Sequence, residues 1–427
     1  MHITKIKIEN LKTLDVFQWE LGPEETKSGW HVFLGDNGSG KSTLLKACAV
    51  ALLGPKNAIG LRLPFEDWIT RGQTEARISL TIEQDFVLDQ WVGTGRTTGS
   101  SLRLGVKIDS GGIEAIETKP SPNRHVWGGQ GWFSASFGPY RRFSGGGKEY
   151  EKLFYSMPKL ASHLSIFGED IALSETLVWL KDLHYQQLDD EKNKVPSAAA
   201  DTLLKLKTFI NQDGFLPNGS KLEEVGPKGV LFKDPSGAII EITSLSDGFR
   251  SILSMTLELI RQLLNSCSID IMFDADISKV IPHGVVIVDE IDVHLHPKWQ
   301  RTIGPWLVSH FPNIQFLVTT HSPLVCQGAT HGSISSLPVP GIKGSGGRIT
   351  GAALDKLLYG DILDAMGSGA FGEGIERSEE AQAMFLELAT LNSKARRATL
   401  TSSQQSRRRE LQIVFGIAAE DGEATNA

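Results

Sequence analysis

The strongest chemical pattern in this sequence is a glycine-rich run that ends in a lysine and a serine. It matches the phosphate-loop pattern G-x-x-x-x-G-K-[S/T] at every fixed position, as Gly35-Asp36-Asn37-Gly38-Ser39-Gly40-Lys41-Ser42. Glycines let the backbone turn so that successive N–H groups surround phosphate oxygens. Lys41 can then reach the β- and γ-phosphates, and the Ser42 hydroxyl can ligate Mg²⁺. We expect this run, with the adjoining Thr43, to bind ATP and Mg²⁺; a chance glycine-rich turn is the alternative.

A pair of acids follows a strongly apolar stretch near residue 290. The residues from Val285 to Val288 are all β-branched, which suits a strand buried on both faces of a parallel sheet. Asp289 and Glu290 come next, at the carboxyl end of that strand, where ligands bind in open α/β sheets. Asp289 is placed to hold Mg²⁺ and Glu290 to polarise an attacking water. Taken without the phosphate loop, two ordinary acids at a solvated strand end would be an equally good interpretation.

Two further runs carry groups that can meet a nucleotide. The run LSDGF opens an expected helix, which Ser246 can cap. Ser246 and Gly248 at a helix N-terminus can also form a second anion site. The run TTHSP ends another apolar strand, and its His321 can contact a γ-phosphate or the catalytic water. A lone histidine in such a place is more often structural.

The elements that must position these motifs alternate between strands and helices, which predicts an α/β fold. Alternation at 76–82 and 102–108 indicates antiparallel strands, and the helix after the phosphate loop is expected to bury Leu44, Leu45, Cys48 and Leu52. Strands are expected at 2–9, 31–34, 285–288 and 314–319, helices at 42–53 and 246–265, helical spacing within 150–212 and 376–415, a hairpin at 220–243 and a loop at 340–348.

Composition narrows the class of protein. The 427 residues carry a formal net charge of −7, which argues against a generally basic nucleic-acid coat. The chain has no apolar run of about 18 residues, so we do not expect an integral membrane protein. Its start shows no secretory signal. Three cysteines, Cys48, Cys267 and Cys326, lie far apart without a C-x-x-C pair, which fits a reducing cytoplasm.

The order and wording of the motifs resemble the ABC-type ATPases of the SMC, RecF and OLD group. The phosphate loop, LSDGF, VVIVDEID-VHLHP-KWQ and FLVTTHSP carry this resemblance, over residues 1–50 and 235–330. Within the group, the sequence resembles the small ATPases of bacterial anti-phage systems, such as the Septu ATPase. FGPYRR near residue 140 and AFGEGIERSEEA at 370–381 match that subgroup more loosely.

The resemblance implies a P-loop NTPase fold of the ABC-type head, with a mixed sheet, an antiparallel β subdomain and a modest helical insertion. It divides the chain into the N-terminal part of the head (1–150), the insertion (151–215), the C-terminal part of the head (216–335) and a helical extension (336–427). It also implies a head-to-tail homodimer or higher oligomer, in which each ATP lies between the phosphate loop of one chain and Ser246 and Gly248 of the other.

Further site residues follow from the same resemblance. Lys12, in ENLK, matches a basic position in the first strand that lies near the nucleotide. Asp292 would lie in the loop at the dimer interface. Asp247 departs from the glycine that transporters have in the signature, which puts the contact with the second chain's ATP in doubt. Gln73 and Gln130 are candidates for the glutamine that such heads place near the nucleotide.

Two other patterns invite functional interpretations. Asp292, His294 and His296 alternate along a loop and could converge on a metal, although the resemblance explains them without one. Basic residues gather after an aromatic-rich stretch and near the C-terminus, where they could contact a DNA backbone or form an ordinary solvated face. They are Arg141, Arg142, Lys394, Arg396, Arg397, Arg407, Arg408 and Arg409.

Several functions fit these features. The leading hypothesis is an ATP-driven dimeric switch in anti-phage defence that acts with an effector nuclease, of the HNH type, encoded nearby. The alternative is a RecF-like ATPase of DNA repair or chromosome maintenance that binds DNA directly. A self-contained nuclease would need a carboxylate cluster after residue 330, where Asp355, Asp361 and Asp364 fit an ordinary helix. A transporter subunit is disfavoured by the wording of the motifs.

Overall fold

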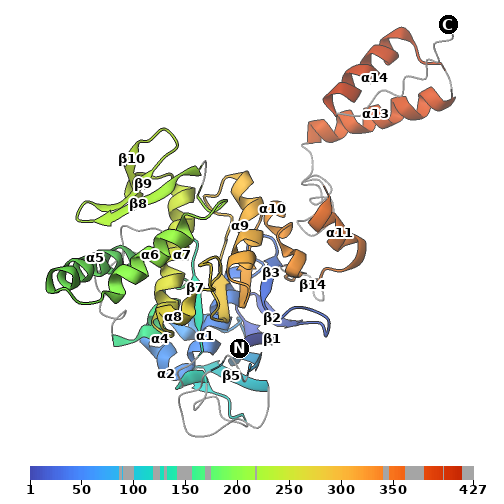
Figure 1. Cartoon of the computed structure of the whole chain (residues 1–427). Coiled ribbons are helices and arrows are strands. Elements are labelled where there is room, and N and C mark those ends of the chain that lie inside the picture. The colour runs from blue at the N-terminus through green and yellow to red at the C-terminus, as the bar shows by residue number, and fades with distance from the viewer. Residues whose placement is uncertain are drawn as a thin grey trace. The chain divides into compact units, whose positions relative to one another are not determined.

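The computed structural model of the chain describes residues 1–85, 89, 101–118, 126–128, 132–141, 156–168, 175–216, 219–339, 346–360, 379–397 and 399–415. Two compact units make up the chain, Met1–Ala365 and Met366–Ala427 (Figure 1). Each unit is described by itself below.

A six-stranded sheet forms the centre of the first unit. Its order is β14-β13-β3-β12-β11-β7, and all of its strands except β14 run parallel to their neighbours. Every residue of β3, β7, β11 and β12 is buried, as expected for a parallel sheet covered on both faces. The strands are β3 (Gly29–Leu34), β7 (Ser134–Phe137), β11 (Gly284–Val288), β12 (Ile314–Thr319), β13 (Gly332–Ser336) and β14 (Gly347–Arg348).

The first unit also contains a separate antiparallel sheet, with the strand order β2-β1-β4-β5-β6. In β1 the buried Ile6 and Ile8 alternate with the more exposed Lys5 and Lys7, so one face meets the core. The predicted antiparallel strands are thereby confirmed. The strands are β1 (His2–Leu11), β2 (Leu14–Glu20), β4 (Glu75–Glu83), β5 (Ser101–Asp109) and β6 (Gly112–Ala115). Strand β2 was not predicted, because its exposed Val16 interrupts the alternation.

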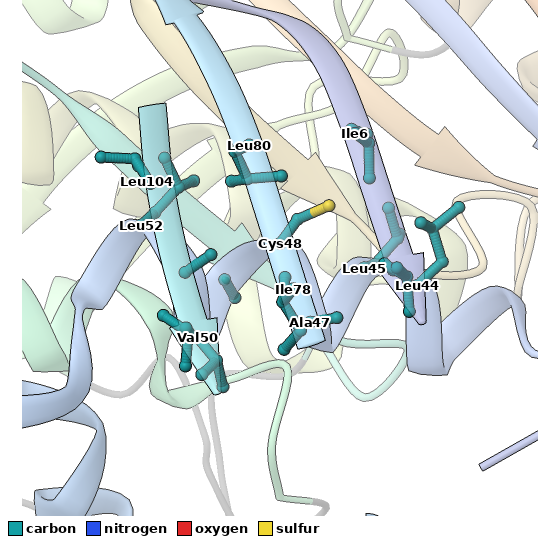
Figure 2. Packing of buried hydrophobic residues seen from close by; sticks show 14 of the residues in the cluster. Ile6, Leu44, Leu45, Ala47, Cys48, Val50, Leu52, Ile78, Leu80 and Leu104 are labelled. Atoms are coloured by element: carbon teal, nitrogen blue, oxygen red, sulfur yellow. The ribbon is translucent and has the colours of Figure 1, made fainter. Parts of the chain in front are cut away.

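Helix α1 (Lys41–Leu53) contacts strands of both sheets. Its four expected core residues are completely buried, and so are the alanines on its other faces, because sheets cover it on both sides. Figure 2 shows Leu44, Leu45, Ala47, Cys48, Val50 and Leu52 beside Ile6, Ile78, Leu80 and Leu104 of the antiparallel sheet. Burial raises the pKa of the Cys48 thiol, so this cysteine serves as a small apolar core residue.

Among the described residues, no single helix has both the length and the apolar composition to cross a bilayer. The segments Lys41–Leu53 and Pro55–Leu61 meet that criterion only when taken together, and the chain bends by 114° between them. The first of these segments is the core helix α1.

Most of the other helices that the sequence predicts in the first unit are present, among them α7 within the predicted 246–265. A second antiparallel sheet, β10-β9-β8, contains the hairpin predicted around Pro235. The expected loop at 340–348 differs at its end, since residues 347–348 pair with β13; residues 340–345 lie outside the described part. The bounds are α2 (Pro55–Ala58), α4 (Pro158–Leu164), α5 (Glu175–Asn193), α6 (Ala198–Ile210), β8 (Lys221–Gly226), β9 (Gly229–Lys233), β10 (Ile239–Glu241), α7 (Asp247–Leu264), α8 (Ile269–Met272), α9 (Pro297–His310), α10 (Pro323–Cys326) and α11 (Gly351–Tyr359).

The second unit contains helices α13 (Glu379–Arg397) and α14 (Ser402–Val414). Leu388, Leu391 and Leu411 form its small core, and a capping box of Thr401 and Gln404 starts α14. Two of its clustered basic side chains are already engaged, since Arg407 pairs with Glu387 and Glu410 and Arg408 donates to the side-chain oxygen of Asn392.

Candidate active site

The carboxyl ends of the parallel strands bring the predicted motifs to one edge of the central sheet. The phosphate loop follows β3, Asp289 follows β11, Thr320 follows β12 and Gly138 follows β7. Backbone hydrogen bonds extend the pairing past the strands, from Asp289 N to the Phe137 carbonyl at 2.8 Å and from Ile291 N to the Thr319 carbonyl at 3.1 Å. This edge is where ligands bind in open α/β sheets.

Positive φ angles shape the phosphate loop. Gly38 and Gly40 have φ values of +81° and +95°, and Gly40 directly precedes α1. A β-carbon at Gly40 would lie 2.9 Å from the Thr13 hydroxyl, so this position needs glycine for conformation and for space. The Ser39 hydroxyl is buried and has no hydrogen-bond partner among the described residues. A loop with free polar groups before a helix N-terminus is the donor set that phosphate requires, so these residues fit ATP.

Lys41 is held inside the loop. Its Nζ donates to the carbonyl oxygens of Gly35 and Asp36, at 2.7 and 3.0 Å, and the residue is 6% exposed. Burial lowers the pKa of the Lys41 ammonium, and the nearby carboxylates of Glu290 and Asp289 oppose that shift. The lysine therefore lies within electrostatic reach of both acids of the VVIVDE motif.

Thr319 links the two acids. Its hydroxyl donates to the Asp289 carboxylate at 2.6 Å and accepts from the Glu290 backbone N–H at 2.8 Å. Asp289 is 2% exposed, whereas Glu290 is half-buried and has a φ of +46°. Asp289 is thus fixed at the carboxyl ends of the parallel strands, where a carboxylate can hold Mg²⁺. The Glu290 side chain remains accessible.

Arg141 differs from its predicted role. The sequence predicts it in a basic cluster that could contact a DNA backbone or form an ordinary solvated face, but the residue is only 4% exposed. Its guanidinium donates to the carbonyls of Gly138, Asp289 and Glu290, at 2.8, 2.9 and 3.1 Å. The arginine thus supports the loop that follows β11, a role that no local sequence signal announced. Arg142 lies outside the described residues.

The start of α7 also differs in detail from the prediction. Ser246 occupies the N-cap position, but its side chain makes no capping hydrogen bond, and the residue is exposed. A β-carbon at Gly248 would lie 2.4 Å from the His294 carbonyl oxygen. Close packing against the loop after Asp292 therefore requires glycine at this position, independently of any ligand.

Two further predicted site residues are Lys12 and His321. Lys12 lies in the turn after β1, not in the first strand, and its Nζ lies 5.4 Å from the centre of the Trp68 ring. The next residue, Thr13, packs against Gly40 of the phosphate loop. His321 is exposed directly after β12.

The alternating Asp292, His294 and His296 do not form a metal site. Asp292 accepts a hydrogen bond from Thr320 at 2.6 Å, and His296 Nδ1 accepts from the Lys298 backbone at 3.3 Å to cap α9. Across the described part of the chain, no three His, Cys, Asp or Glu residues group to hold a metal ion. Gln73 is exposed in the turn before β4, and Gln130 lies outside the described residues.

Comparison with known proteins supports the resemblance. The Septu protein PtuA of Bacillus mycoides (strain KBAB4) is 25% identical over 342 residues, which are 78% of this chain and 40% of that protein. The Retron Ec83 probable ATPase of Escherichia coli is 36% identical over 154 residues, which are 36% of this chain and 27% of that protein. The chain thus spans less than half the length of these relatives. A solved SMC head, bound to the C-winged helix domain of ScpA, matches with a TM-score of 0.49 and 14% identity, over 82% of this chain and 97% of that one.

A family model covers the part of the chain that carries the two acids and the TTHSP run, but not the phosphate loop. The model described as "AAA domain, putative AbiEii toxin, Type IV TA system" matches residues 107–327, more than half of the 427 residues. The matched range contains the strands β7, β11 and β12, whose ends form the site. The chain therefore belongs to this AAA-domain family, and its sequence is similar to the Septu protein PtuA and to a retron probable ATPase.

Proposed function

We propose that this chain binds ATP with Mg²⁺ and hydrolyses it to ADP and phosphate, as a nucleotide-driven dimeric switch. One observation carries the proposal. Lys41 is buried within electrostatic reach of Asp289 and Glu290, at the sheet edge where the phosphate loop begins. Phosphoryl transfer to water needs three groups. Lys41 is the cation for the phosphates, Asp289 is a fixed carboxylate for a metal, and Glu290 is an accessible carboxylate for the attacking water.

Each site residue has a role in this proposal. The loop from Gly35 to Thr43 would surround the phosphates, with Lys41 balancing their charge. Ser42 and Asp289 would hold Mg²⁺, which would supply further charge neutralisation. Glu290 orients the attacking water and accepts its proton. His321 lies at the neighbouring strand end, where an imidazole can donate to the γ-phosphate. Lys12 borders the site through Thr13.

The N-terminus of α7 supports the dimer in this proposal. Ser246 is exposed and its hydroxyl does not cap its own helix, so it is free to meet a phosphate that another subunit holds. Ser246 and Gly248 of one chain would then close over the phosphate loop of the other.

The process served by this switch is inferred from the relatives. We propose that the switch serves anti-phage defence in the bacterial cytoplasm, with an effector nuclease of the HNH type as the partner, and the similarity to a Septu protein and to a retron probable ATPase supports this proposal. Direct DNA binding, as in a RecF-like repair ATPase, is the second candidate. It is favoured by the exposed Lys394, Arg396 and Arg397 at the end of α13. An adjacent gene for an HNH nuclease would support the first, and salt-sensitive binding of duplex DNA by the chain alone would support the second.

The site assignment is tested with the Glu290→Gln variant. The amide keeps the shape of the side chain but cannot accept a proton, so ATP should bind while hydrolysis is lost. Size measurement by light scattering, with and without ATP, should then show a trapped dimer or higher oligomer. Unchanged turnover of Glu290→Gln would place the catalytic group elsewhere, with Asp292 as the next candidate.

The shared site is tested by mixing two inactive variants. Ser246→Arg should block closure without weakening ATP binding to the isolated chain, and Lys41→Ala should remove ATP binding. In a mixed dimer one interface holds both lesions and the other holds neither, so partial ATPase activity should return. No recovery in proven mixed dimers would argue for a site within one chain or for obligatory coupling of two sites.

A further inference from the structure

A single buried arginine joins three parts of the site that lie far apart in the sequence. Arg141 lies just beyond β7, and its Nη1 and Nη2 donate to the carbonyls of Asp289 and Glu290, at 2.9 and 3.1 Å. Its Nε donates to the Ser251 hydroxyl, on α7, at 3.0 Å. The guanidinium therefore connects the loop that carries the two acids with the helix that begins at the Ser246 anion site.

The contacts of Arg141 differ from those of a typical buried arginine. Among the described residues, its hydrogen-bond acceptors are the carbonyl oxygens of Gly138, Asp289, Glu290 and Ile291 and the Ser251 hydroxyl, and none of them is a carboxylate. Burial lowers the pKa of this guanidinium to about 10, against the opposing effect of Asp289. Burying a cation without an ion pair is costly, so a residue needed only for packing would be better served by an apolar side chain.

The backbone of Glu290 is held from both sides. Glu290 has a left-handed φ of +46°, which costs free energy for a residue with a β-carbon. Its N–H donates to Thr319, at the end of β12, and its carbonyl accepts from Arg141. Together these two bonds determine the orientation of both peptide groups beside the residue that would activate water.

Helix α7 meets the same loop a second time. Gly248 packs so closely on the His294 carbonyl that a β-carbon would come within 2.4 Å of it. Ser251, one turn further along α7, is 2% exposed and contacts Arg141. A displacement of the start of α7 is therefore transmitted to the loop through Gly248 at one end and through the guanidinium at the other.

We infer that Arg141 is a positioning residue that transmits the placement of α7 to Glu290. The inference rests on the proposed ATP hydrolysis at this site. When a phosphate of the second subunit engages Ser246, α7 takes one defined position, and the Ser251–Arg141 contact sets the Glu290 peptide for reaction. Without that engagement the glutamate is less well aligned, so hydrolysis is tied to closure of the dimer.

Ser251→Ala is the most selective test, because it removes the contact with α7 and leaves the four carbonyl contacts of Arg141 in place. We expect kcat for ATP to fall about 10-fold, since small misplacements of catalytic groups cost this much or more, while the Kd for ATP changes less than about 2-fold. Ser254→Ala is the matched control. Ser254 is a buried serine of the same helix whose hydroxyl donates to the Ser251 carbonyl, and its loss should leave kcat unchanged.

Arg141→Lys extends the test to the whole contact. Lysine keeps the charge but cannot donate to the five oxygens that the planar guanidinium reaches, so kcat should fall about 100-fold with near-constant Kd for ATP. In the Arg141→Lys protein, Ser251→Ala should have no further effect, because both changes break the same connection. If Arg141→Lys does not fold, the comparison of Ser251→Ala with Ser254→Ala decides.

The inference and the proposed function fail in different ways. Equal kcat for Ser251→Ala, Ser254→Ala and the unchanged protein would overturn the inference while ATP hydrolysis stands. Multiplicative losses in the double variant would overturn it as well. A chain that hydrolyses no ATP, or whose hydrolysis survives Glu290→Gln, would instead overturn the proposed function.

Discussion

The Thr319 hydroxyl donates to the Asp289 carboxylate at 2.6 Å, and both groups are completely or almost completely buried. The same oxygen accepts from the Glu290 backbone N–H. One hydroxyl thereby fixes the carboxylate proposed to hold Mg²⁺ and the peptide of Glu290, the proposed catalytic base. The first threonine of TTHSP is a link between two strand ends, while sequence analysis had drawn attention to the histidine.

Thr319→Val should lower ATP hydrolysis by roughly 10-fold or more. Valine preserves the shape, but the buried carboxylate and the Glu290 N–H each lose a partner, which typically costs about 1–3 kcal/mol per group. Steady-state ATPase assays measure the effect, and Thr319→Ser, which keeps the hydroxyl, is the control. Equal activity of the valine and serine variants would show that this bridge does not align the site.

Lys41→Ala should abolish ATP binding at micromolar concentrations, a loss of roughly 100-fold or more, since a charge-assisted contact with the phosphates is removed from a buried position. Isothermal titration with ATP measures the affinity. Lys56→Ala, at an exposed lysine of the neighbouring α2, is the control and should bind normally. Retained micromolar binding by Lys41→Ala would refute the assignment of residues 35–42 as the phosphate site.

Gly248→Ala should destabilise the first unit by about 1–3 kcal/mol, the usual cost of overpacking. The new methyl group would lie 2.4 Å from the His294 carbonyl oxygen, so α7 or the loop has to move. Urea unfolding measures the loss. Ser246→Ala is the comparison, because the Ser246 hydroxyl makes no capping bond whose removal would cost stability. A fully stable Gly248→Ala protein would mean that this contact is loose.

Acid should destabilise the fold through His163. This ring is completely buried and lies between the hydroxyls of Ser134 and Ser136, at 2.8 and 2.5 Å. Burial lowers the pKa of His163 from 6.5 to about 3. Below pH 6.5 His163 is therefore protonated in the unfolded chain but stays neutral in the folded chain. The free energy of unfolding falls as the pH decreases toward about 3.

His163→Asn measures this contribution. The amide keeps polar groups beside the two serines but does not titrate, so urea midpoints between pH 6.5 and 4 should fall less steeply than in the unchanged protein. The difference should reach a few kcal/mol at most, by the usual ~1.4 kcal/mol per pKa unit. His321→Asn, at an exposed histidine, should leave the slope unchanged. Parallel slopes for His163→Asn and the unchanged protein would contradict a neutral buried ring.

The sequence alone determined those parts of the site that local patterns encode. The run from Gly35 to Ser42 needs glycines at particular steps for its backbone, and the run from Val285 to Glu290 needs β-branched residues before its acids. Such requirements lie within a few neighbouring residues, so they can be read without knowing what lies nearby in space. The resemblance to defence ATPases, confirmed by the relatives, also rested on these short runs.

The tertiary structure decided which side chains act together. Arg141 resembled a surface cation in the sequence, yet pairing of β7 with β11 buries it against carbonyls that lie almost 150 residues away. Gly248 resembled a ligand-binding residue, yet its close approach to His294 already requires glycine. Contacts of this kind depend on which strands become neighbours in the sheet, and no single segment carries that information.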